Sequence, residues 1–178
     1  MLTTNFKNLV ALLLGARSTS GVGLLPVKAT NGTTYYAVGA FGASGTFPYS
    51  VTTGLNNNMT GVGIGFGSGN LAESESDYTL QTPITSGLTA TVTINSGMDG
   101  ASPYLRYDII VQNTSNADIT IAEMCYKQNI YASTAQGAAT SNSNRVCMLD
   151  RTVLPEAVTI PAGGAATIRY TLKTLIGS

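Results

Sequence analysis

The sequence has no histidine and no tryptophan, and only 9 lysines and arginines and 9 aspartates and glutamates occur in its 178 residues. Because histidine is the commonest general base and the commonest protein metal ligand, its absence excludes Ser-His-Asp and Cys-His catalysis. No other set of acid, base and nucleophile can be assembled from the remaining residues. We therefore expect no enzymatic activity, no catalytic residue, no metal site and no bound cofactor.

Charge is also scarce, since charged residues make up 10% of the chain, whereas ordinary soluble domains carry about 25%. The net charge is zero, so little repulsion opposes association and few charged side chains guard the strand edges. This composition predicts a surface that neighbouring copies cover, with a neutral extracellular surface as the alternative. No basic stripe is present, and we expect no nucleic-acid partner.

No apolar run approaches the roughly 18 residues of a membrane-spanning helix, so no membrane association is expected. The N-terminal segment instead predicts one short amphipathic helix over residues 5–15, with Thr4 or Asn5 as its N-cap. Residues 1–20 are thus expected to form a helix or an arm on a neighbouring subunit. A signal peptide is the alternative interpretation, because Lys7 precedes the apolar run 9–14, but that run is short.

The only two cysteines, Cys125 and Cys147, cannot form a four-ligand zinc site in one chain without histidine. They are predicted to be small buried apolar residues, and a disulfide between them remains the alternative. Oxygen ligands occur at alternate positions in Glu73, Glu75 and Asp77. This spacing could hold calcium, but it lacks the further ligands of an EF-hand, so a solvated acidic loop is the preferred interpretation.

Glycine alternates with other residues from Gly61 to Gly69, which places Val62, Ile64 and Phe66 on one face of an extended segment. Something must pack closely against the bare backbone of the other face. The segment contains neither G-x-G-x-x-G nor G-x-x-x-x-G-K, so a phosphate-binding loop is not expected.

Period-2 alternation predicts strands over residues 34–41, 47–51, 88–94, 105–111, 146–149 and 168–172. Residues 107–126 read as strand, turn and strand, with a bulge near Ala122 because Glu123 falls at an apolar position. Residues 158–172 read as a C-terminal hairpin around Pro161. The uncharged residues 128–144 are expected to form a long polar loop. Tyr35 and Tyr36 could stack on sugars or bases, although aromatic residues in strands are more often core or interface.

Eight or nine short strands in a chain of this length predict a single all-β domain spanning residues 1–178. The expected architecture is an Ig-like or jelly-roll antiparallel β-sandwich with a short N-terminal helix or arm. Such a chain can bury about 70% of the surface that its unfolded form exposes.

Three segments together resemble a pattern in small virion structural proteins of tailed bacteriophages and prophages. They are the glycine-rich stretch that runs into SDYTLQTPI (76–84), YDIIVQNTSNADITIAEMCY (107–126) and MLDRTVLPEAVTIPAGGAATIRYTL (148–172). The resemblance covers about residues 60–175 and depends on the order of all three segments, with LDR leading into the final strands.

The resemblance implies a structural subunit that assembles as a homo-oligomer on the head, neck or tail of the particle. Its partners would be copies of itself and other virion proteins, and it would be made in the host cytoplasm and reside in the virion. The alternative is a receptor- or glycan-binding module of a tail fibre or adhesin, which an exposed aromatic cluster in a groove would favour.

Overall fold

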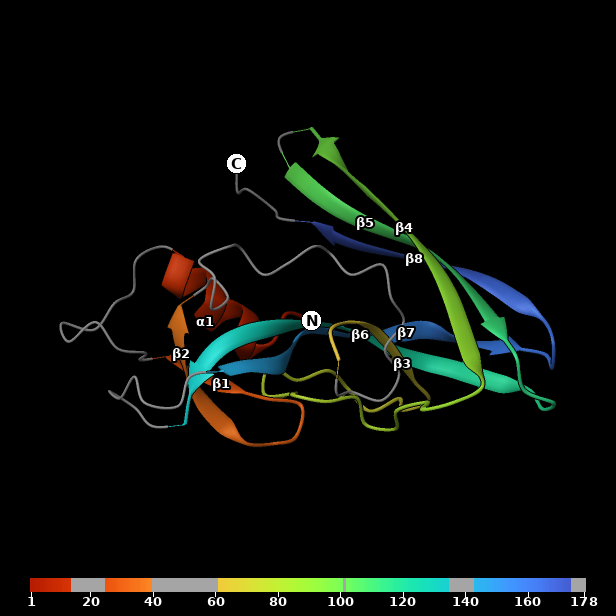
Figure 1. Cartoon of the computed structure of the whole chain (residues 1–178). Helices are drawn as coiled ribbons and strands as arrows, with labels where there is room; N and C mark the ends of the chain where they lie inside the picture. Colours follow the sequence, from red (N-terminus) through yellow and green to blue (C-terminus); the bar gives the residue numbers. More distant parts are fainter. Residues whose placement is uncertain (14–24, 40–60, 101, 135–142, 174–178) are drawn as a thin grey trace.

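The computed structural model describes residues 1–13, 25–39, 61–100, 102–134 and 143–173. These residues form one helix and eight strands in two antiparallel sheets, which confirms the predicted all-β sandwich-like fold (Figure 1). Several strands are longer than the short ones expected from the sequence. The predicted strand 47–51 lies outside the described residues.

The larger sheet is built around β6 (Ile119–Ser133), which pairs with β7 (Ser143–Ile160) on one side and with β3 (Gly63–Gly67) and β2 (Thr34–Gly39) on the other. Strand β1 (Leu25–Lys28) pairs with β2. Just after β1, Ala29 forms a bridge with Cys147 of β7, so this end of the sheet curls back on itself. The predicted polar loop 128–144 is therefore wrong in its first part, because Gln128 and Ser133 are buried residues of β6.

The smaller sheet has the order β4-β5-β8, with β4 (Leu88–Asp99), β5 (Ser102–Asn113) and β8 (Ala165–Lys173). The predicted alternation is confirmed here: Tyr107, Ile109 and Val111 of β5 are buried in the core, whereas Ile110 between them is exposed. The sheets meet at the end that carries the β5–β6 and β7–β8 connections and diverge toward the β4–β5 connection (Figure 1).

The two strand-turn-strand segments do not form hairpins. Strand β5 pairs with β4 and β8, whereas β6 pairs with β7, so both the β5–β6 and the β7–β8 connections cross from one sheet to the other. The predicted C-terminal hairpin is wrong for this reason. Alternation identifies a strand and its buried face, but both an arch and a hairpin satisfy the same pattern.

The buried side chain of Asn113 ties the two arches together. Its amide nitrogen donates to the carbonyls of Ala117 at 2.7 Å and Ile160 at 2.9 Å, and its oxygen accepts from the amide and hydroxyl of Ser115. Its backbone N–H donates to the carbonyl of Gly164 at 2.9 Å. Every donor and acceptor of this side chain thus has a partner within the connections that it joins.

The bulge expected near Ala122 is confirmed. Ile121 and Met124 both face the main core, so the alternation shifts by one residue between them. Ile121 pairs with Val158, whereas Glu123 pairs with Val153. Ala122 of β6 therefore lies opposite residues 154–157 of β7, so most of the unpaired residues of this bulge belong to β7. The shift turns Glu123 to the opposite face of the sheet.

Helix α1 (Thr4–Leu13) packs on β1 and β7, with Leu9 buried in the main core and Phe6 packed against it. Its N-cap is Thr3 rather than Thr4 or Asn5, since the hydroxyl oxygen of Thr3 accepts a hydrogen bond from the backbone N–H of Phe6 at 3.5 Å. The Asn5 side chain is instead buried, where it exchanges hydrogen bonds with the backbone of Lys28. In the described residues no helix is long and apolar enough to cross a bilayer.

Replacing Asn113 with alanine should lower the free energy of unfolding by about 1–3 kcal/mol, because the buried carbonyl of Ile160 and the partly buried carbonyl of Ala117 would lose their donor. The exposed Asn116 of the same turn is the matched control, and its replacement with alanine should change stability by at most about 0.5 kcal/mol. Urea unfolding measures both values. Equal losses at the two positions would contradict the role assigned to Asn113.

Candidate functional site

A segment without regular structure, residues 68–86, covers the face of the larger sheet that is turned away from the smaller one. Its Leu80 forms a second buried cluster with Cys125 and Met148, separate from the main core. Its Thr82 and Ile84 exchange backbone hydrogen bonds with Ser68 and Phe66 at the end of β3. The molecule therefore has a third layer, and polar contacts hold that layer in place.

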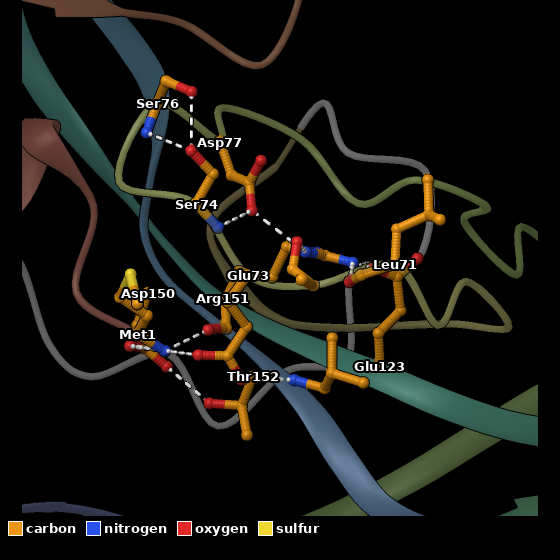
Figure 2. A network of polar contacts seen from close by, with 12 residues as sticks. Met1, Leu71, Glu73, Ser74, Ser76, Asp77, Glu123, Asp150, Arg151 and Thr152 are labelled. Carbon is orange, nitrogen blue, oxygen red and sulfur yellow. Dashed lines mark hydrogen bonds and ion pairs between the residues drawn. The ribbon is translucent and has the colours of Figure 1, made fainter.

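Arg151 lies at the centre of these contacts (Figure 2). Its guanidinium is fully buried and donates to Glu123 Oε2 at 2.7 Å and to Asp77 Oδ2 at 2.9 Å. The same group donates to the carbonyls of Leu71 at 3.1 Å and Ala72 at 3.4 Å. One side chain of β7 thus binds a carboxylate of β6 and three groups of the covering segment.

The Glu123 carboxylate needs the space that two glycines leave. Its second oxygen accepts from the backbone N–H of Thr82 at 2.9 Å. A Cβ atom at Gly67 would lie 2.4 Å from Glu123 Oε1, and one at Gly69 would lie 2.7 Å from the same atom. The predicted close approach to the bare glycine face is therefore confirmed at these two residues, and the group that approaches is a carboxylate.

The acidic residues 73, 75 and 77 each bind a different cation and do not converge on one point. The α-amino group of Met1 lies 2.7 Å from Glu73 Oε2, Lys7 of α1 pairs with Glu75, and Asp77 binds Arg151. Within the described ranges no group of three potential ligands could hold a metal ion. The solvated acidic loop is a correct interpretation only for Glu75, because Glu73 and Asp77 are partly buried ion-pair partners.

Electrostatics favours the charged forms of this network. Burial alone would raise the pKa of Glu73, but the Met1 amino group, the Val153 N–H and Arg151 together lower it. Burial alone would lower the pKa of Arg151, but the hydrogen bonds that it donates to Glu123 and Asp77 raise it. The arginine therefore stays protonated although its side chain is buried.

Asp150, the neighbour of Arg151, connects the same region to the smaller sheet. Its carboxylate accepts from the hydroxyl of Tyr170 and lies 3.3 Å from the Met1 amino group. Burial, followed by the charge of Asp150, raises the pKa of Tyr170 well above its usual range, so the phenol remains a donor. The ring of Tyr170 packs against that of Tyr107 of β5, with centroids 5.8 Å apart and the ring planes tilted by 38°.

The two cysteines are free and buried, as expected for small apolar residues. They lie in separate clusters, with Cys125 beneath the covering segment and Cys147 in the main core. Burial raises the pKa of each thiol to about 12. Both thiols are thus protonated and shielded near neutral pH, which makes them poor nucleophiles.

The outer face of the smaller sheet is mostly polar, although Ile110 of β5 is exposed on it. It exposes Thr89, Thr91 and Thr93 of β4. Its charged residues form one cluster, in which Asp108 accepts from Arg169 at 2.7 Å and from Arg106 at 3.1 Å. The hydrogen bond from Arg169 is the main cause that lowers the pKa of Asp108.

Strand β4 is an edge of this sheet, because among the described strands it pairs with β5 alone. From Leu88 to Met98 it contains no charged residue, no proline and no described bulge, and its inner-face residues are apolar except for Ser96. The other edge strand, β8, contains Arg169 and Lys173. A long uncharged edge with unpaired backbone groups is a template for pairing with another strand. We regard β4 as the candidate interaction site.

A shallow hollow of about 440 Å³ lies beside the arches. Its lining combines hydroxyl groups with one carboxylate and two isoleucines and includes no aromatic residue: Ser68, Ile84, Thr85, Ser86, Gly87, Ser115, Asp118, Ile119 and Thr120. Of the two tyrosines considered above as stacking platforms, Tyr35 is a core residue beneath the guanidinium of Arg145, whereas Tyr36 is partly buried. The hollow itself offers no aromatic platform for a sugar.

The sequence pointed to some of these residues but not to their grouping. The spacing predicts Glu73, Glu75 and Asp77 as possible calcium ligands, but it does not group them with Arg151, Glu123 and Asp150. One signal was available, since Glu123 breaks the apolar alternation of its strand. Comparison with protein-family models, curated proteins and solved structures gives no match.

Replacing Arg151 with methionine should destabilise the chain by about 3–5 kcal/mol, because Glu123 would remain buried without its cation. Adding Glu123→Leu to that variant should recover part of the loss, since the fully buried carboxylate is then removed. Arg169→Met is the control at an exposed ion pair, where little change is expected. A double variant as unstable as Arg151→Met alone, measured by urea unfolding, would contradict this account.

Replacing Gly67 with alanine should cost about 1–3 kcal/mol, because the added methyl group overlaps Glu123 and the carbonyl oxygen of Thr82. The neighbouring Ser68 is exposed, so Ser68→Ala serves as the control and should be nearly neutral. Thermal or urea unfolding of the two variants compares them. A neutral Gly67→Ala would show that the carboxylate has room to move.

Proposed function

We propose that this chain is a structural protein of a tailed-bacteriophage virion that assembles as a homo-oligomer on the head, neck or tail. Its mechanism is adhesion: edge strands pair between subunits, and the sandwich acts as a rigid block. Its partners are copies of itself and other virion proteins, and its location is the particle. The resemblance of residues 60–175 to small virion proteins supports the assignment to a particle.

The uncharged edge of β4 is the observation that carries the proposed adhesive role. Natural sheets protect exposed edges with lysine, proline, bulges or short strands. From Leu88 to Met98, β4 has none of the first three and is a long strand. In a chain with 10% charged residues and zero net charge, long-range repulsion does not compensate for this edge.

The buried polar network suits a subunit that must keep its shape under load. Arg151 fixes the covering segment to the larger sheet, and Asp150 connects that sheet to Tyr170 of β8. Groups held by several charge-assisted hydrogen bonds have little freedom to reorient. The receptor- or glycan-binding alternative receives no comparable support, since the hollow beside the arches offers hydroxyl groups without an aromatic platform.

The purified chain should form oligomers in light scattering, and Thr91→Lys combined with Thr93→Lys should shift it toward the monomer by placing two charges on the β4 edge. Thr167→Lys combined with Thr171→Lys, at exposed positions of β8, is the control with the same added charge. The control should associate like the unmodified chain. A monomeric unmodified chain at high concentration would contradict the proposal.

The virion assignment has a separate test. An antibody against the purified chain should label particles released by the cells that encode it, at one repeated position in electron micrographs. Particles that contain none of this chain by mass spectrometry would overturn the assignment, even if the chain oligomerises in solution.

A further inference from the structure

We propose that two copies of the chain pair through β4 in antiparallel fashion, about a two-fold axis that passes beside Thr93. The result is a continuous six-stranded sheet with the order β8-β5-β4-β4-β5-β8. This inference rests on the proposed homo-oligomeric function and specifies its contact. We assign the partner strand to a second copy of the chain, because the β4 edge is complementary to itself in charge, in apolar pattern and in length.

The face pattern restricts the possible registers. In β4 the inner face carries Leu88, Val92 and Ile94, and the outer face carries the threonines. A two-fold axis perpendicular to the sheet keeps inner faces inner, so only registers that pair residues of the same parity keep both faces matched. Each such register places one residue opposite its own copy.

Apolar matching selects Thr93 for that position. With Thr93 opposite Thr93, Leu88 lies opposite Met98 of the other copy, and Val92 lies opposite Ile94. Met98 is 63% exposed in the single chain, so this register gives a large apolar side chain a partner. Asp99 falls beyond the paired stretch, which leaves the paired strands without charge.

The outer face is equally compatible. Thr93 meets its own copy, and Thr91 lies opposite Asn95, both of which are favourable polar cross-strand pairs. Strand β8 lacks this property, because Arg169 exposes a cation at that edge. The same pairing at β8 would bring like charges close together, so the asymmetry of the sheet favours β4.

Single cysteine substitutions test the register directly. In an antiparallel pair, residues directly opposite have Cα atoms about 4.5–5.5 Å apart, which lies within the roughly 4.4–6.8 Å range of disulfides. Thr93→Cys should therefore form a covalent dimer under mild oxidation, seen at twice the monomer mass on a non-reducing gel. The native thiols should not interfere, because both are buried.

Thr91→Cys and Thr89→Cys are matched controls on the same strand and the same face. In the proposed register Thr91 is displaced by four residues from its own copy, about 13 Å along the strands, so neither control should form the covalent dimer efficiently. Efficient dimerisation through Thr91 would overturn the register. Efficient dimerisation through Thr167→Cys of β8, with none through Thr93, would overturn the β4 contact.

Light scattering of the reduced, unmodified chain separates this inference from the proposed function. An oligomer whose Thr93→Cys variant forms no covalent dimer overturns the β4 pairing but leaves the homo-oligomeric function intact. A monomer overturns both.

Discussion

The buried ion pair between Arg151 and Glu123 is the interaction on which the arrangement of layers depends. A guanidinium that is buried away from water needs hydrogen-bond acceptors for its N–H groups. Here β6 and the covering segment supply these acceptors. Removing one partner of such a pair is far more costly than exchanging both for apolar residues. The main effect of the pair is therefore to specify one position for the irregular covering segment, and its net contribution to the free energy of unfolding is secondary.

Three segments that are distant in the sequence, residues 76–84, 107–126 and 148–172, meet in this region. The first contributes Asp77, the second Glu123, and the third Asp150, Arg151 and Tyr170. Their order along the chain brings a loop, a central strand and its neighbour to one place. A physical reason thus exists for the three segments to occur together, because each supplies a charge or donor that another segment requires.

The arch end of the sandwich and the β4 edge of its smaller sheet differ in a way that suits assembly. At the arch end, the side chain and the backbone N–H of Asn113 join the two connections by hydrogen bonds. Along β4, by contrast, the backbone N–H and C=O groups that point away from β5 have no partner strand among the described residues. A rigid block with an unprotected edge has a simple geometry for strand pairing between subunits.

The sequence by itself determined the all-β class, most strands, the N-terminal helix, the bulge near Ala122 and the close approach to the glycine face. These features depend on local periodicity and on steric room, which neighbouring residues specify. Only the tertiary structure decided that both strand-turn-strand segments are arches, and that Glu73, Glu75 and Asp77 bind three separate cations. Which strand pairs with which, and where a charge finds its partner, depends on residues distant in the chain, because alternation is the same in a hairpin and in an arch.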